Sequence, residues 1–145
     1  MVLKADFYQI TQGDCENLYN LAVSECIRFY RSDRFKGKIS ILTCSAEEAK
    51  RISMLLWRAD GFFPNTMSGA PDQILSPIVI GPQAADKCSL LINLQLNKNA
   101  FTENELNSET IIDFIADFHT ESIEACRLRY KQLKKSASDF EFHRT

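Results

Sequence analysis

Short apolar runs alternate along this chain with longer stretches of helical periodicity, and this alternation restricts the possible folds more than any other feature. Strand-like runs, rich in β-branched and aromatic residues, cover 6–10, 39–43, 77–81, 89–94, 111–115 and 139–142. Apolar residues recur at helical spacing in 17–31, in 46–57 and in a stretch that begins near residue 120. Such alternation predicts an α/β fold with a mostly parallel central sheet flanked by helices.

Capping residues mark the expected starts of two of these helices. Ser45 and Glu48 form a predicted capping box, in which Ser45 accepts from the Glu48 amide and the Glu48 carboxylate returns to the Ser45 amide. Thr120 is the expected N-cap of the last long helix. Residues 58–76 carry glycine and proline turn signals, so we expect a loop there.

Bulk properties place the chain among ordinary globular proteins. Its 145 residues suffice for one domain, which we assign to 1–145 because no linker, repeat or low-complexity tract interrupts the chain. Hydrophobic residues make up 45% of it, yet no apolar run approaches the roughly 20 residues that span a bilayer. The N-terminus lacks the apolar stretch of a signal peptide, so we expect no membrane partner and a cytoplasmic location.

The chain holds five cysteines, which are scattered and form no C-x-x-C pair. An odd number without paired spacing is typical of reduced thiols in a reducing compartment. Structural zinc sites usually use closely spaced cysteine pairs, so we expect no metal site.

Sequence signals for catalysis are weak. Gly37-Lys38 is followed by Ile39-Ser40 rather than by serine or threonine, no G-x-G-x-x-G occurs, and we therefore expect no phosphate loop. Of the two histidines, His119 is expected at the surface and His143 near a fraying end. A cysteine–histidine pair stays open, because such partners meet in space. The simplest prediction is a non-catalytic protein without a cofactor.

The stretch 126–135 carries five positive charges and no acid, although the whole chain has a net charge of −2. On a helical wheel, an apolar stripe with Tyr130 lies directly beside Arg127, Lys131 and Lys134. One interpretation is a solvated face that compensates the helix dipole. The other is a site for a short peptide with an acidic part and an apolar anchor, because arginine can hold a carboxylate in bidentate fashion.

A second candidate surface is aromatic. Trp57 ends a predicted helix, and Phe62, Phe63 and Pro64 follow in the predicted loop. These side chains either cover the edge of the sheet or form a contact for a protein partner, since aromatic residues dominate such interfaces.

These stretches, in this order, resemble the chi subunits of bacterial DNA polymerase III holoenzyme, which are accessory proteins of the clamp loader. The resemblance runs nearly end to end. The residues that carry it are Phe7-Tyr8, Leu56-Trp57, Phe62-Phe63-Pro64, Pro77-Ile78-Val79-Ile80, Ile112-Asp113-Phe114-Ile115, Arg127-Leu128-Arg129-Tyr130-Lys131 and the segment near Phe140.

The resemblance implies a mononucleotide-binding-like topology without a phosphate loop, and a linking rather than a catalytic role. Chi pairs with the psi subunit of the clamp loader and binds the acidic C-terminal tail of single-stranded-DNA-binding protein, so DNA is contacted only indirectly. The implied tail pocket comprises Arg127, Tyr130, Lys131 and Lys134, with Phe114 and Ile115 as its apolar wall. The implied psi contact comprises Trp57, Phe62, Phe63 and Pro64.

The sequence departs from the family pattern at Ile123, where a further cation of the pocket is expected, and in a longer connection over 116–122. The alternative function is a small nucleotide-binding or nucleotide-modifying enzyme on the same fold. An enzyme needs a polar, glycine-rich cleft at the carboxyl ends of the strands, whereas the linking protein needs an apolar groove edged by cations along the last helix.

Overall fold

The computed structural model describes residues 2–71, 73 and 75–144. Its strands are β1 (Lys4–Ile10), β2 (Ile39–Leu42), β3 (Asn65–Met67), β4 (Ile78–Gly81), β5 (Leu90–Asn93), β6 (Thr110–Ala116) and β7 (Asp139–Arg144). Its helices are α1 (Cys15–Tyr30), α2 (Ala46–Arg58), the short α3 (Glu103–Leu106) and α4 (Ile123–Ser136), which follows a 3₁₀ turn at Thr120–Ser122.

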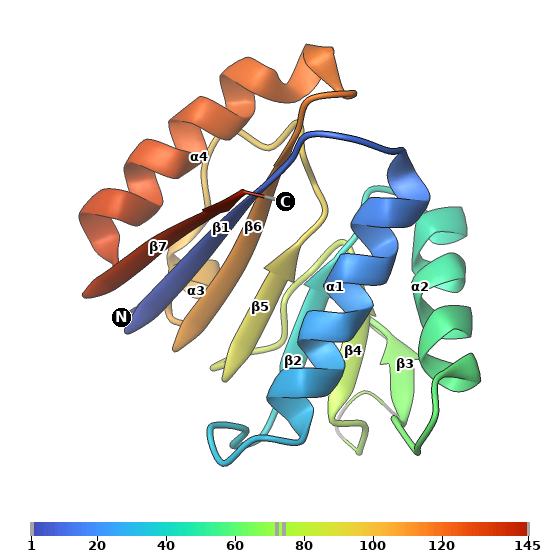
Figure 1. Ribbon diagram of the computed structural model, residues 1–145. Coiled ribbons are helices and arrows are strands. Elements are labelled where there is room, and N and C mark those ends of the chain that lie inside the picture. The colour runs from blue at the N-terminus through green and yellow to red at the C-terminus, as the bar shows by residue number, and fades with distance from the viewer. Residues whose placement is uncertain (1, 72, 74, 145) are drawn as a thin grey trace.

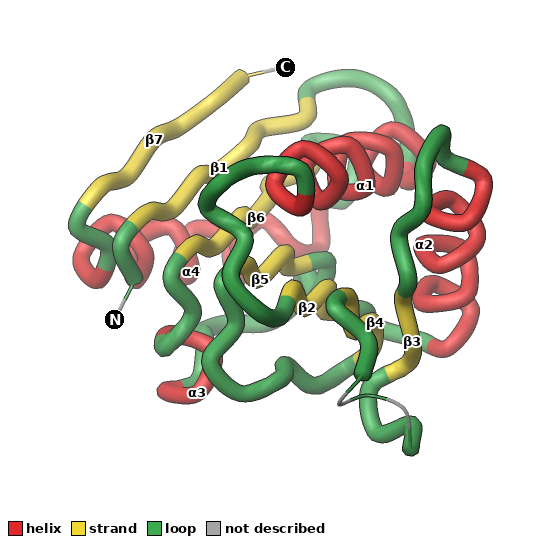
Figure 2. The backbone as a smooth tube through the Cα atoms, turned by 90° about the horizontal axis from the view of Figure 1, so that it is seen from below, coloured by secondary structure: helices red, strands yellow, loops and turns green. Residues whose placement is uncertain are grey.

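The strands form one seven-stranded sheet in the order β3-β4-β2-β5-β6-β1-β7. Every neighbouring pair is parallel, which confirms the predicted α/β class and makes the sheet wholly rather than mostly parallel. Helices α1 and α2 cover one face, and α4 and α3 cover the other (Figure 1, and Figure 2 from below). The edge strands are β3, beside α2, and β7, beside α4.

Side chains alternate between the two faces of the sheet because successive residues of a strand point in opposite directions. In β6, Ile112 and Phe114 belong to the core under α1 and α2, whereas Ile111 and Ile115 belong to the core under α4. The central strands β2, β4 and β5 are buried along their whole length, as parallel strands covered on both faces must be.

Two predicted helix starts differ in detail from the structure. Ser45 accepts from the Glu48 amide as expected, at 3.1 Å, but the Glu48 carboxylate accepts from the Cys44 amide instead of the Ser45 amide. The prediction that Thr120 caps the last helix is wrong. Thr120 opens the 3₁₀ turn, with His119 as its N-cap residue and no side-chain capping bond, and α4 begins three residues later.

The sequence prediction missed two short elements. Strand β3 lies inside the expected loop of 58–76 and pairs with β4. Helix α3 follows Thr102, whose hydroxyl and the Glu105 carboxylate form a capping box. The final strand reaches Arg144, so His143 lies in a paired strand and not in a frayed end.

Within the described residues, no helix is long and apolar enough to cross a membrane.

Candidate peptide-binding groove and partner surface

A buried ion pair fixes helix α4 on the sheet. Arg129 is fully buried, and its Nε donates to Asp113 Oδ2 at 2.8 Å in the middle of β6. The guanidinium also donates to the carbonyl oxygens of Leu96, at 2.7 Å, and Lys98. One of the five cations of 126–135 is therefore structural and contributes no surface charge. An acid inside an apolar strand, as Asp113 is, indicates a buried cationic partner, since buried charges are paired.

An open groove of about 260 Å³ runs between α4 and the strands β6, β1 and β7. Its lining is mainly apolar, with cationic side chains from α4. The residues that line it are Phe7, Gln9, Ile115, Cys126, Arg127, Tyr130, Lys131 and Phe142. Strand β7 therefore supplies part of the groove, which brings the last residues of the chain next to the first strand.

Tyr130 organises the aromatic side of the groove. Its ring meets the rings of Phe7, Phe140 and Phe142 edge to face, with centroids 5.3, 5.1 and 5.8 Å apart. Phe142 also stacks on Phe7 and keeps 42% of its surface exposed. These contacts hold the rings in fixed orientations, so an apolar side chain that enters the groove meets a preformed wall.

The cations at the groove are available to a ligand. Arg127 Nη1 lies 3.9 Å from Glu124 Oε2, but both side chains are largely exposed, at 69% and 81%, so this pair is weak. Lys131 is exposed, and none of the ion pairs among the described residues includes it. Lys134 Nζ sits 5.8 Å from the centroid of the Tyr130 ring. The groove thus combines an apolar floor with positive charge along its α4 side.

The structure brings together most of the residues predicted for the tail pocket. Ile115, Arg127, Tyr130 and Lys131 line the groove, and Lys134 stacks near Tyr130 outside the lining. The prediction that Phe114 forms the wall is wrong. Phe114 is fully buried on the opposite face of the sheet, because it alternates with Ile115 along β6.

Phe7, Gln9 and Phe142 line the groove and were missed as site residues. Phe7 and Gln9 lie far from α4 in the sequence, whereas Phe142 follows soon after the helix in β7, and the pairing of β1 with β6 and β7 places all three at the groove. Their β strands were expected, but no local pattern gives the order of strands in a sheet.

The second candidate surface lies at the C-terminal end of α2. Trp57 is 53% exposed and Phe62 74% exposed, and their ring centroids are 6.2 Å apart. Pro64 is half-buried beside them. The prediction that Phe63 belongs to this surface is wrong, because Phe63 is only 3% exposed and its ring packs beneath the Arg31 guanidinium.

The described part of the chain contains one group of potential metal ligands, Asp6, Glu141 and His143, whose ligand atoms lie within 4.8 Å of one another. The Lys4 ammonium already lies 3.9 Å from Asp6 and 3.8 Å from Glu141, and its positive charge disfavours the binding of a metal cation there. His143 Nε2 lies 2.8 Å from Asp6 Oδ1, and its ring stacks on Tyr8. The cluster thus joins β7 to β1.

Seven parallel strands with helices on both faces define an α/β protein of the mononucleotide-binding type, here without a phosphate-loop sequence. The C-terminal domain of the DEAD-box protein Dbp5 has a similar fold: the TM-score is 0.60 at 11% identity, over 99% of this chain and 89% of that one. At this identity the likeness concerns the fold alone. No curated protein sequence matches the chain.

The family model of the DNA polymerase III chi subunit, HolC, matches residues 3–141, which is nearly the whole chain. The protein therefore belongs to the chi subunit family of DNA polymerase III.

Proposed function

We propose that this protein is a non-catalytic accessory subunit that joins the clamp loader, through psi, to the acidic C-terminal tail of single-stranded-DNA-binding protein. Membership of the chi family supports a role in replication, and hence a cytoplasmic one. In this proposal the α4 groove holds the tail, and the surface around Trp57 and Phe62 holds psi. DNA is reached only through the tail-bearing protein.

The observation that carries the proposal is the combination of apolar wall and free cations in the α4 groove. The terminal phenylalanine of the tail packs against Ile115, Tyr130 and Phe142. Its carboxylate pairs with Arg127, and the preceding aspartates meet Lys131 and Lys134. Ile123, which replaces an expected cation, is the half-buried first residue of α4 and leaves this site with fewer charges for the tail.

The exposed pair Trp57–Phe62 supports the psi contact. Two large aromatic side chains exposed together are costly to leave in water and are typical of binding hot spots. The protruding Phe62 is the expected anchor, and Trp57 forms its side wall. Psi would bury both rings.

The test is fluorescence anisotropy of a labelled acidic peptide that ends in proline-phenylalanine, titrated at low and high salt. We expect a dissociation constant of about 1 μM, on the order of −8 kcal/mol. High salt should weaken binding, because the rim cations are exposed and their charge is screened. Arg127→Ala should weaken it about tenfold or more, as for a lost charge-assisted hydrogen bond.

Lys135→Ala is the matched control, since it removes one charge from the last turn of the same helix outside the groove lining. If both variants weaken binding equally, only the net charge of α4 matters and the groove is not the site. If neither the parent nor the variants bind the peptide, the proposal fails. The enzyme alternative then becomes the next hypothesis, and a calorimetric screen of nucleotides tests it.

A further inference from the structure

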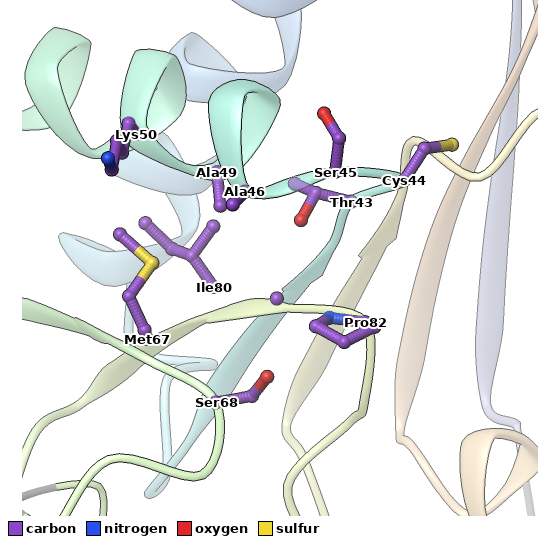
Figure 3. A pocket seen from close by; sticks show the side chains of 11 residues that line it. Thr43, Cys44, Ser45, Ala46, Ala49, Lys50, Met67, Ser68, Ile80 and Pro82 are labelled. Atoms are coloured by element: carbon purple, nitrogen blue, oxygen red, sulfur yellow. The ribbon is translucent and has the colours of Figure 1, made fainter.

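A larger cavity lies at the opposite edge of the sheet from the α4 groove, at the carboxyl ends of β2, β3 and β4. It measures about 350 Å³ and is bounded by the first turns of α2, the end of β3 and the end of β4 (Figure 3). Most of its wall is apolar and includes Ala49, Met67 and Ile80. The carboxyl ends of parallel strands are where ligands usually bind in open α/β sheets, and the volume is in the usual range for small-ligand pockets.

A buried hydroxyl in this cavity lacks a partner. Thr43, at the end of β2, is only 1% exposed, and no described residue forms a hydrogen bond with its Oγ1. The oxygen points from β2 toward the space between Ile80 and Pro82 (Figure 3). Buried hydroxyl groups almost always have a partner, so a ligand atom at the back of the cavity would satisfy this one.

Further donors gather at the same end of the cavity. The amides of Ala46 and Glu47, in the first turn of α2, have no intrahelical acceptor, whereas the Glu48 amide is capped by Ser45. The nearby Glu48 carboxylate is already engaged, because it accepts from the Cys44 amide at 2.9 Å and from the Tyr19 hydroxyl at 2.6 Å.

The cavity also carries one positive side chain. Lys50 lines it and is exposed, and no ion pair among residues 2–71, 73 and 75–144 includes its ammonium. It lies beside Met67, at the other end of the cavity from Thr43 (Figure 3). The N-terminal end of the α2 dipole supplies a modest positive potential at the Thr43 end. There is no arginine in the lining and only one lysine, which suits a single negative charge better than a phosphate group.

We propose that this cavity binds a small organic monocarboxylate with an apolar body. The carboxylate accepts from the Thr43 hydroxyl and the first amides of α2, and the exposed Lys50 adds a positive charge at the other end of the cavity, beside Met67 (Figure 3). The apolar body packs against Ala49, Met67 and Ile80. The same chemistry is offered by a free acid or by the C-terminal residue of a peptide. The site is separate from the α4 groove and does not depend on the function proposed for that groove.

The experiment is a titration of the isotope-labelled full chain followed by ¹H–¹⁵N NMR, with 3-phenylpropanoate as the free acid and an uncharged-side-chain tripeptide ending in phenylalanine as the chain terminus. The amide of 3-phenylpropanoate is the neutral probe. We expect shift changes at Thr43, Ala46 and Lys50, about tenfold weaker binding of the neutral probe, and no effect of Arg127→Ala. The tighter of the two carboxylate probes identifies the source of the ligand.

Two variants locate the site. Thr43→Val keeps the side-chain volume but removes the hydroxyl, and should weaken carboxylate binding while thermal unfolding shows an intact fold. Ala46→Phe should fill the mouth of the cavity and abolish binding. Ala100→Phe, the same change at another exposed alanine, should not. The proposal is overturned if neither carboxylate shifts the cavity resonances at about 10 mM, if the amide binds equally well, or if a nucleotide binds there instead.

Discussion

Arg127 and Arg129 are two residues apart on α4 and have opposite surroundings. Arg129 is fully buried, donates to Asp113 and to three backbone carbonyls, and holds the helix on the sheet. Arg127 is 69% exposed, and its only ion pair with a described residue is the 3.9 Å contact with Glu124. Arg129 therefore governs stability and Arg127 is free for a ligand, although both side chains carry the same charge.

Removal of Arg129 should unfold much of the protein under mild denaturant. Arg129→Met leaves the Asp113 carboxylate buried without its cation, and we expect a loss of about 3–5 kcal/mol in the free energy of unfolding by urea. Arg127→Met, the same change at the exposed position, should stay within about 0.5 kcal/mol of the parent.

The double variant Asp113→Asn, Arg129→Met should regain part of the loss, because it no longer buries an unpaired charge. The side-chain amide oxygen introduced at position 113 would still accept from Phe114 N and from Asn93, as the Asp113 carboxylate does in the parent. Equal unfolding midpoints for the parent and Arg129→Met would show that the ion pair does not hold α4.

Tyr8 makes stability sensitive to alkaline pH. Burial, followed by its hydrogen bond to Glu25, raises the pKa of Tyr8 well above its ordinary value of 10.0. The unfolded chain releases this proton first, so the stabilisation is complete below pH 10.0 and is lost as the pH rises above it. Urea unfolding at a series of pH values from about 8 to 11 should show this fall, with a shallower slope for Tyr8→Phe. An unchanged slope in Tyr8→Phe would contradict the assignment.

At the scale of elements, the α4 groove depends on its neighbour β7. This edge strand pairs only with β1, through the register from Lys4 with Asp139 to Gln9 with Arg144. It brings Phe142 against Phe7 and Tyr130. On the other face of β7, His143 contacts Asp6 and joins the strand to β1. The groove is thus a product of strand order, although its charges come from one helix.

A chain that ends at Ser138 should keep the other six strands but lose the groove. Without Phe142 one wall of the aromatic cluster is missing, and we expect about tenfold or greater weakening of the tail peptide, or about 1.4 kcal/mol. Circular dichroism checks the fold and anisotropy measures the binding. His143→Gln, which keeps the strand in place, is the control. Undiminished binding by the shortened chain would remove β7 from the site.

Local sequence patterns predict whether a long element is a helix or a strand, but not which of its side chains point to which side. The runs around 39–43 and 111–115 are strands as expected, yet nothing local decides which of Phe114 and Ile115 faces α4, or which of Phe62 and Phe63 turns outward. Strand β3 has three residues, too few to show the alternating pattern of a strand, and the turn signals around it predict a loop. The capping box of Thr102 with Glu105 is a readable signal for α3, but periodicity alone does not reveal so short a helix.

At the scale of the whole molecule, the two proposed binding surfaces lie at opposite ends of the sheet. Trp57 ends α2 next to the edge strand β3, whereas the α4 groove adjoins the edge strand β7 (Figure 1). Six strand spacings of about 4.8 Å separate these edges, or about 29 Å. The segment 121–135 carries five bases and two acids, but the burial of Arg129 with Asp113 reduces its surface charge from +3 to +2.

This separation predicts that psi and the tail bind independently. The distance exceeds the screening length of about 8 Å at physiological salt, so charges at one surface do not reach the other. The central strands are buried and closely packed, and neither surface shares a side chain with the other.

We expect the anisotropy-derived affinity for the tail peptide to change by less than about twofold when psi is saturating, well under 1.4 kcal/mol. Phe62→Ala should release psi and leave tail binding intact, while Arg127→Ala should do the reverse. A tail affinity that rises or falls tenfold with psi would instead mean that the sheet has two arrangements and that each partner selects between them.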